Sequence, residues 1–551
     1  MAAVSPHTAV AQAHSGATRS PLVYGPRGPR LKRGAQPCRP ARVRPMPSVA
    51  DPFARFRDQT IGQDAVFDTP YGRQRLIYAD WTASGRLYAP IERILCERFG
   101  PWVGNTHSEN SKTGRTMTLA YHEARRILKA HVHAGREDLL ILTGSGMTGA
   151  MNKFQRILGL KAPEGLRKYI GIPTDRRPVV FVTHMEHHSN HTSWYETIAE
   201  VVVIPPDTQG RVDLDAFAGL LHEYRARPLK IGSFTACSNV TGVVTPYHEL
   251  ARRMHRAGGV AFVDFAASAP YVTIDMHPAD PEARLDAVLF SPHKFLGGPG
   301  SCGVLVFNGA LYHNRAPDDS GGGTVNWTNP WGGYSFVDDI EAREDAGTPG
   351  FLQAIRAALA VRLKEQMSVA AMQARERAIV PRILDALQAT PGVHVLAADL
   401  RERLAIFSFY MEQVHYNLAV RLLNDRFGVQ ARGGCSCAGT YGHFLLHVDP
   451  SRSKAITDHI DHGDLSQKPG WVRLSFHPSS SDAEIAQALE AVRAIAAQGA
   501  CWAQDYHYLP ASNDFVHRQE PHDTAARVRA GFALPPAAAA GRGARLRQAD
   551  C

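Results

Sequence analysis

A lysine directly follows a short β-rich segment, where its charge would be hard to accommodate. Lys294 ends the sequence Ser291-Pro292-His293-Lys294, which comes after the apolar residues 286–290. A charged amine at the end of a buried strand is costly unless it is neutralised or reacts. A Schiff base with an aldehyde would do both, so Lys294 is a candidate nucleophile. Taken alone, it also fits an ordinary solvated loop lysine.

A glycine-rich segment is expected to bind a phosphate. Residues 144–149 read Gly-Ser-Gly-Met-Thr-Gly, between a predicted strand and a predicted helix. Such glycines let backbone N–H groups approach an anion, and the helix N-terminus favours it. The segment also fits the G-x-G-x-x-G pattern of dinucleotide-binding domains. Glu164 would then bind the ribose, but it lies in a loop, so a nicotinamide dehydrogenase is the weaker alternative.

Further polar residues follow the ends of other predicted strands. Asp264 ends the segment 260–264, where a carboxylate can pair with a pyridinium nitrogen. His187 can stack on a ring, and Asn239 can bond to a phenolic oxygen. Open α/β sheets bind ligands at the carboxyl ends of their strands. His187 and His191 are also spaced i, i+4, but there is no H-E-x-x-H motif and we predict no metal site.

The elements that must position these residues alternate along the chain. Short apolar runs alternate with helical patterns between residues 137 and 308, which predicts one large α/β domain with about seven mostly parallel strands. A smaller α+β domain is expected from 351 to 500. Residues 351–387 read as one long helical stretch and 448–470 as a polar surface loop or lid. The predicted strands are 139–143, 178–183, 201–204, 230–235, 260–264, 286–290 and 303–307 in the large domain, with 393–396, 404–410 and 471–476 in the small one.

Composition and charge narrow the function classes. The chain has 551 residues, of which 44% are hydrophobic and 21% charged, which excludes a wholly disordered or collagenous chain. Of the net charge of +9, residues 1–50 carry +8 and residues 524–551 carry +4, so the body between them carries −3. We therefore predict no nucleic-acid partner; salt-dependent binding that is lost on deleting residues 1–50 would indicate the opposite. No run reaches the ~18 apolar residues of a membrane span, so no membrane association is expected.

The two ends of the chain are expected to lie outside the folded domains. Residues 1–50 are predicted to be a disordered basic tail, 51–350 the N-terminal segment and large domain, and 501–551 a mostly disordered extension. The first tail is rich in Arg and free of acids, as organellar transit peptides are; a translation start at Met46 is the alternative. Eight cysteines without a C-x-x-C pair fit a reducing compartment. We expect a cytoplasmic protein, or an organellar one if the tail is a transit peptide.

The ordered set of motifs resembles a known family. It is similar to fold-type I pyridoxal-phosphate enzymes of the class V aminotransferase group, and within it to cysteine desulfurases, selenocysteine lyases and the desulfurase domain of molybdenum-cofactor sulfurases. The resemblance runs from about residue 77 to 497 and implies the two-domain α/β fold predicted above. It rests on Tyr78-Ala79-Asp80, Gly104-Asn105-Thr106-His107-Ser108, the Gly144 loop, Glu186-His187-His188, Ser238-Asn239-Val240, Val263-Asp264, Ser291-Pro292-His293-Lys294, Gly321-Gly322-Gly323-Thr324, Glu344-Asp345-Ala346-Gly347-Thr348-Pro349 and Arg432-Gly433-Gly434-Cys435-Ser436-Cys437.

This resemblance implies a role for each matching residue. Lys294 would form the Schiff base with pyridoxal 5'-phosphate and then move protons. Arg432 and Arg473 would clamp the substrate carboxylate, a task that suits the planar guanidinium. Thr324 would reach the phosphate of a partner subunit, which implies a homodimer. The remaining cofactor contacts would be Asp264 to the pyridinium nitrogen, His187 stacked on the ring, Asn239 near O3′, and Met147, Thr148, Ser291 and His293 at the phosphate.

Cys437 falls at the position of the persulfide-forming cysteine of the desulfurases. Nearby positive charge would favour its thiolate, and we expect its Gly-rich segment to be mobile. The resemblance implies abstraction of sulfur or selenium from an L-cysteine-type substrate, with a sulfur-acceptor protein as a further partner. Two departures, Ala267 where the family usually has Gln and Pro292 where it has a small residue, leave the reaction type open. The alternative is an aminotransferase, epimerase or lyase acting on another amino acid without a cysteine nucleophile.

Overall fold

The computed structural model describes residues 51–106, 109–519 and 524–534. The expectations for residues 1–50, including the transit peptide and the start at Met46, lie outside the described residues. No helix in the described part of the chain is long and apolar enough to cross a membrane.

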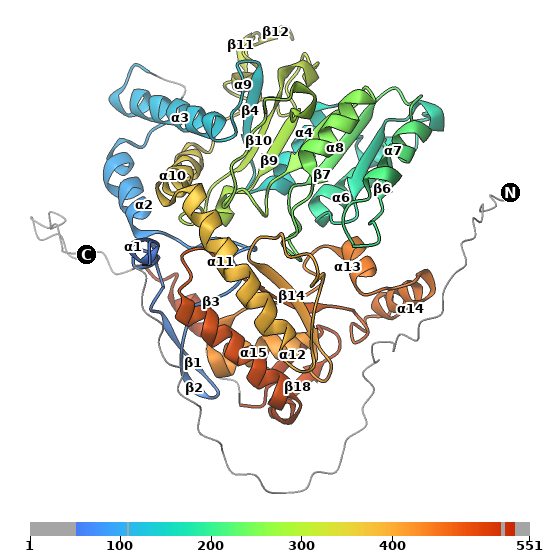
Figure 1. The fold of residues 1–551 in the computed structure, drawn as a ribbon. Coiled ribbons are helices and arrows are strands. Elements are labelled where there is room, and N and C mark those ends of the chain that lie inside the picture. The colour runs from blue at the N-terminus through green and yellow to red at the C-terminus, as the bar shows by residue number, and fades with distance from the viewer. Residues whose placement is uncertain (1–50, 107–108, 520–523, 535–551) are drawn as a thin grey trace, which may run out of the picture. The chain divides into compact units, whose positions relative to one another are not determined.

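A seven-stranded sheet forms the centre of the large domain (Figure 1). Its strand order is β4-β10-β9-β8-β7-β5-β6, and β10 alone runs antiparallel to its two neighbours, β4 and β9. The mostly parallel sheet predicted from the sequence is thereby confirmed. The strands are β4 (Asp138–Thr143), β5 (Val179–Thr183), β6 (Glu200–Ile204), β7 (Lys230–Thr235), β8 (Val260–Asp264), β9 (Ala287–Phe290) and β10 (Gly303–Asn308).

Helices cover both faces of this sheet, which explains why its strands are continuously apolar. In β5, Phe181 packs in one core cluster with Phe217 and Leu250, whereas its neighbour Val180 packs in another with Phe154. Successive side chains of a strand point to opposite faces, so both faces need apolar residues. The helices of this domain are α3 (Lys112–His131), α4 (Met147–Ile157), α5 (Glu164–Arg167), α6 (His188–Tyr195), α7 (Leu214–Glu223), α8 (Tyr247–Arg256), α9 (Ile340–Arg343) and α10 (Phe351–Met367).

The small domain is an antiparallel sheet packed against three long helices. Its order is β13 (Val393–Val395), β14 (Ile406–Met411), β17 (Trp471–Ser475) and β16 (Arg432–Gly434). The helices are α11 (Val369–Gln388), α12 (Tyr416–Phe427) and α15 (Asp482–Trp502). The single helical stretch predicted for 351–387 is wrong in one respect, because Ser368 has a φ of 65° and separates α10 from α11. Its hydroxyl then accepts a hydrogen bond from the Ala371 N–H and caps α11.

Short elements surround these two domains. N-terminal residues form α1 (Ala54–Arg57), the hairpin β1 (Val66–Thr69) and β2 (Gly72–Arg75), β3 (Ile77–Tyr78) and α2 (Ala89–Arg93). Strand β3 pairs in parallel with β15 (Val429–Gln430) of the small domain. A hairpin of β11 (Val325–Thr328) and β12 (Tyr334–Phe336) extends from the large domain.

Two regions predicted as irregular are folded. The polar segment 448–470 contains the exposed helix α14 (Pro450–Asp461), preceded by α13 (Gly439–Leu445). The expectation that 501–551 is mostly disordered is wrong for the hairpin β18 (Tyr506–Leu509) and β19 (Asp514–His517). Tyr506 is buried in the small-domain core, and its hydroxyl donates to Asp425 Oδ2 at 2.8 Å. A short helix, α16 (Thr524–Ala530), follows.

Candidate active site

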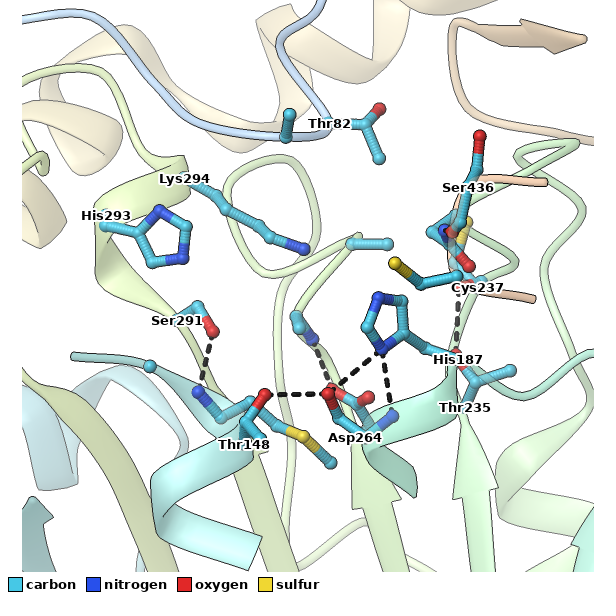
Figure 2. Close-up of a pocket in the computed structure, with 18 of the residues that line it drawn as sticks. Thr82, Thr148, His187, Thr235, Cys237, Asp264, Ser291, His293, Lys294 and Ser436 are labelled. Carbon is cyan, nitrogen blue, oxygen red and sulfur yellow. Dashed lines mark hydrogen bonds between the residues drawn. The ribbon is translucent and has the colours of Figure 1, made fainter. Parts of the chain in front are cut away.

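A cavity of about 250 Å³ lies where the carboxyl ends of the central strands meet the small-domain strands β16 and β17 (Figure 2). Eleven of the twelve residues predicted for the site line it. The exception within this chain is Thr324, which is fully buried elsewhere and donates its hydroxyl hydrogen to Gly321 O at 2.7 Å. The eleven are Met147, Thr148, His187, Asn239, Asp264, Ser291, His293, Lys294, Arg432, Cys437 and Arg473.

Lys294 and Asp264 line this cavity, and burial shifts the pKa of each side chain. Lys294 ends a 3-10 turn (Pro292–Lys294) directly after β9, and burial of its amine lowers its pKa to about 8. Burial likewise raises the pKa of Asp264 to about 6, partly offset by a hydrogen bond from the Ala266 N–H at 2.7 Å and by the charge of Lys294. A lysine that can lose its proton near neutral pH is a competent nucleophile, and a buried carboxylate needs a cationic partner.

The glycine-rich loop leads into the N-terminus of α4 beside Ser291. Gly144 has a φ of 56°, which a residue without a side chain adopts readily. A Cβ at Gly146 would lie 3.0 Å from Ser291 Oγ, so the loop is packed tightly against the lysine turn. The Met147 N–H donates to Ser291 Oγ at 2.8 Å, as Figure 2 shows. These N–H groups and hydroxyls suit a phosphate.

His187 comes directly before α6 and is held by its own helix. Its Nδ1 accepts a hydrogen bond from the Ser189 N–H at 3.1 Å, which fixes the ring at the helix start. Burial, together with the charge of Lys294, lowers the pKa of His187 to about 3, so the ring is neutral. Asn239 uses its amide nitrogen to bond to Ser436 O at 2.7 Å, and its buried Oδ1 has no partner among the described residues.

Arg473 and Arg432 bring positive charge to the cavity. Arg473 is buried; its Nη2 donates to Asp80 Oδ1 at 2.7 Å and its Nη1 to Asn239 O at 3.0 Å. Its Nε has no partner in the described part of the chain. Arg432 is exposed at the cavity mouth. Both residues predicted to clamp a carboxylate therefore line the cavity, with the Arg473 guanidinium partly engaged by Asp80; their binding of a substrate stays a prediction.

Cys437 is exposed and lines the same cavity. Hydrogen bonds join its loop to neighbouring segments, and the mobility expected from its glycines stays a prediction. The Cys437 carbonyl accepts from the His188 N–H at 2.8 Å, and the Ser436 hydroxyl accepts from Trp471 Nε1 at 3.2 Å. Both departures from the family pattern lie at the site, since Ala267 lines the cavity and Pro292 begins the lysine turn.

Sequence reasoning missed several residues that line the cavity. Ser189 shares a hydrogen bond with Thr148, with 2.6 Å between their hydroxyl oxygens, and its position two residues after His187 was the available signal. Cys237 is buried, and burial raises the pKa of its thiol. The other residues missed are Thr82, Ala83, Thr235 and Ala266.

This donor set fits pyridoxal 5'-phosphate. The loop at Gly146 and Ser291 suits the phosphate, the buried Asp264 carboxylate suits a pyridinium nitrogen, and Lys294 can react with an aldehyde. The fold and cavity thus define an α/β protein with a buried lysine and a buried carboxylate that line one cavity at the carboxyl ends of sheet strands.

Comparisons with known proteins also indicate an enzyme. The family model of the class-V aminotransferases matches residues 77–488. A probable cysteine desulfurase of Halobacterium salinarum is 29% identical over 379 residues, which covers 66% of this chain and 83% of the relative. One of Halalkalibacterium halodurans is 26% identical and covers 68% and 86%. The solved cysteine desulfurase of Thermococcus onnurineus matches with a TM-score of 0.65 and 22% identity, covering 82% of this chain and 100% of that one. The chain belongs to the class-V aminotransferase family, whose members are pyridoxal-phosphate-dependent enzymes.

Proposed function

We propose that this protein is a cysteine desulfurase or selenocysteine lyase-like enzyme that takes sulfur from an L-cysteine-type substrate. The observation that supports this most directly is the exposed Cys437 thiol on the wall of the cavity that also holds Lys294 and Asp264. The curated relatives that the chain matches over two thirds of its length are described as probable cysteine desulfurases.

Pyridoxal 5'-phosphate would supply an electron sink for the substrate carbon when it is bound. Met147, Thr148, Ser291 and His293 line the cavity and would bind the phosphate, and His187, which also lines it, would stack on the ring. Asp264 would hold the proton on the ring nitrogen. Lys294, whose pKa is lowered to about 8 by burial, would take and return protons at the substrate carbons.

The substrate's carboxylate would lie against Arg432 and Arg473, which leaves its sulfur toward Cys437. The Cys437 thiolate attacks that sulfur, and the carbon–sulfur bond breaks with its electron pair passing to the substrate carbon. A new sulfur–sulfur bond forms on Cys437 as a persulfide, and protonation of the carbon yields alanine. No outside oxidant or reductant is needed for this step.

The test is the release of sulfide and alanine from L-cysteine under a reducing thiol. Cys437→Ala should lose sulfide release, whereas Cys501→Ala, which removes another exposed free cysteine in α15, should retain it. Lys294→Ala should lose both the reaction and the cofactor's visible absorption. Wild-type sulfide release by Cys437→Ala would rule out the persulfide on Cys437, whereas 2-oxo-acid-dependent amino transfer that this substitution leaves unchanged would establish the aminotransferase.

A homodimer is part of this proposal. The hairpin β11–β12 follows Thr324 and exposes three large aromatic side chains, Trp327, Trp331 and Tyr334. Exposed aromatic groups at this density are typical of an interface. Light scattering on the purified chain should give twice the mass of one chain, and Trp331→Ser should weaken the association; a monomeric wild type would contradict it.

A sulfur-acceptor protein and a reducing compartment complete the proposal. Cys437 is exposed, so a persulfide there is accessible to an acceptor thiol. All six described cysteines are free, as expected for a cytoplasmic protein. Transfer of radiolabelled sulfur from the loaded enzyme to a candidate acceptor protein tests the first point, and cell fractionation tests the second.

A further inference from the structure

The loop that carries Cys437 adopts a backbone conformation that it would not hold alone. Ser436 has a φ of 53° and Cys437 a φ of 57°, so two consecutive residues with side chains lie in the left-handed region. Such residues cost free energy and persist only where surrounding contacts fix them. The contacts around this loop therefore decide where the Cys437 thiol lies.

Two of these contacts come from one residue of the large domain. The main-chain N–H of His188 donates to the Cys437 carbonyl at 2.8 Å. The ring of the same residue accepts, at Nε2, a hydrogen bond of 2.9 Å from the N–H of Gly439. His188 thus holds the chain on both sides of Ala438, through the Cys437 carbonyl and the Gly439 N–H.

We infer that His188 is a positioning residue for Cys437, holding the thiol loop of the small domain on the N-terminus of α6. This inference rests on the proposed function, because it gives Cys437 a role in sulfur transfer. His188 does not line the cavity, so it acts through the loop and not by touching substrate or cofactor. His187, one residue earlier, faces the cavity, so one short segment places both the ring-stacking group and the thiol.

The chemistry of the ring suits this role. A ring nitrogen accepts a hydrogen bond only when it carries no proton. Partial burial and the positive charge of Lys468 lower the pKa of His188, which favours the neutral ring. His191 lies one turn later on α6 and contacts Thr440, the residue after Gly439. This contact involves only the Thr440 side chain, with 3.1 Å between His191 Nδ1 and Thr440 Oγ1.

The experiment compares three variants of the cofactor-loaded enzyme. His188→Phe keeps the backbone N–H and the ring's bulk but removes the acceptor for Gly439. His188→Gln restores an acceptor on a side chain of similar reach. His191→Phe is the matched control on the same helix, because it disturbs the side-chain contact to Thr440 and leaves both hydrogen bonds of His188.

Amide hydrogen exchange of residues 435–442 measures how firmly the loop is held, independently of sulfur transfer. We expect His188→Phe to exchange about tenfold faster there and to release sulfide roughly tenfold more slowly, as the loss of one hydrogen bond allows. KM and the cofactor absorption should stay within about twofold of wild type, since the cavity is untouched. His188→Gln should recover most of both losses, and His191→Phe should resemble wild type.

Unchanged exchange at 435–442 in His188→Phe would overturn the inference, as would a loss of cofactor absorption in that variant. So would slow sulfide release in His191→Phe equal to that of His188→Phe. A different result would contradict the proposed function, namely sulfide release by Cys437→Ala. That result would not change the interpretation of the amide exchange measurement.

Discussion

Arg432 and Arg473 lie directly opposite each other on the neighbouring antiparallel strands β16 and β17. Like charges at opposed positions of a sheet destabilise it. Asp80 pairs with Arg473 at 2.7 Å and compensates one of the two charges. The remaining positive charge lies at the cavity, which suits the proposed binding of the substrate carboxylate.

Arg432→Gln should therefore weaken substrate binding. Loss of a charge-assisted hydrogen bond to a carboxylate should raise KM for L-cysteine roughly 10- to 100-fold, with a smaller effect on kcat. The measurement is steady-state sulfide release. Cysteamine lacks the carboxylate, so its apparent affinity, followed by the change in cofactor absorption, should be equal in wild type and variant. A loss of cysteamine affinity as large as that of L-cysteine would show that Arg432 has another role.

The sheet and most of the site could be predicted because local sequence carries their signal. Strands buried on both faces read as apolar runs, as in β5 and β9, and polar residues at their ends must meet at one edge. Asp264 ends such a strand, Lys294 and His187 each follow one by four positions, and all three line the cavity.

Other features depend on contacts between distant parts of the chain. Two hydrogen bonds that join the Cys437 loop to the large domain come from His188, about 250 positions earlier in the chain. Tyr506 is buried only because its ring packs in the small-domain core and its hydroxyl donates to Asp425. Neither contact leaves a periodic pattern in the local sequence.

The amine of Lys294 should react at lower pH than an ordinary lysine. Burial lowers its pKa from 10.5 to about 8, so the neutral, nucleophilic form becomes dominant as the pH rises through about 8. We expect the rate of reductive methylation at Lys294 in the cofactor-free protein to reach half its maximum near pH 8. Mass spectrometry provides Lys454 as an internal control, because its ion pair with Asp458 raises its pKa. Equal midpoints for the two lysines would contradict the prediction.

Lys153 should stabilise α4, the helix that follows the glycine-rich loop. It lies buried in α4, 3.0 Å from the fully buried Glu344 and 3.4 Å from Asp318. Lys153→Met would leave Glu344 as a buried charge without this partner, which costs about 3–5 kcal/mol in the free energy of unfolding. Urea denaturation measures this loss, and cofactor affinity should fall with it. Lys454→Met, which breaks an exposed ion pair, should have little effect; a similar loss in both variants would show that burial of the pair is irrelevant.

Glu186 should be the most sensitive buried carboxylate near the site. Its Oε1 accepts hydrogen bonds from the Thr183 N–H at 3.2 Å and the Thr235 N–H at 2.8 Å, and its Oε2 accepts one from Asn190 Nδ2 at 2.7 Å. It therefore ties together the ends of β5 and β7 and the start of α6, the elements on which His187 and Thr235 are placed.

Glu186→Ala would leave these buried donors without an acceptor, at about 1–3 kcal/mol each. We expect a loss of at least ~3 kcal/mol in the free energy of unfolding, together with weaker cofactor binding. Glu376→Ala is the matched control, because that buried carboxylate accepts one long hydrogen bond, of 3.3 Å from the Ala405 N–H, and does not line the cavity. It should lose less stability and keep the cofactor. If the two variants lost equal stability and both kept the cofactor, Glu186 would be an ordinary core residue and not the link between the strand ends.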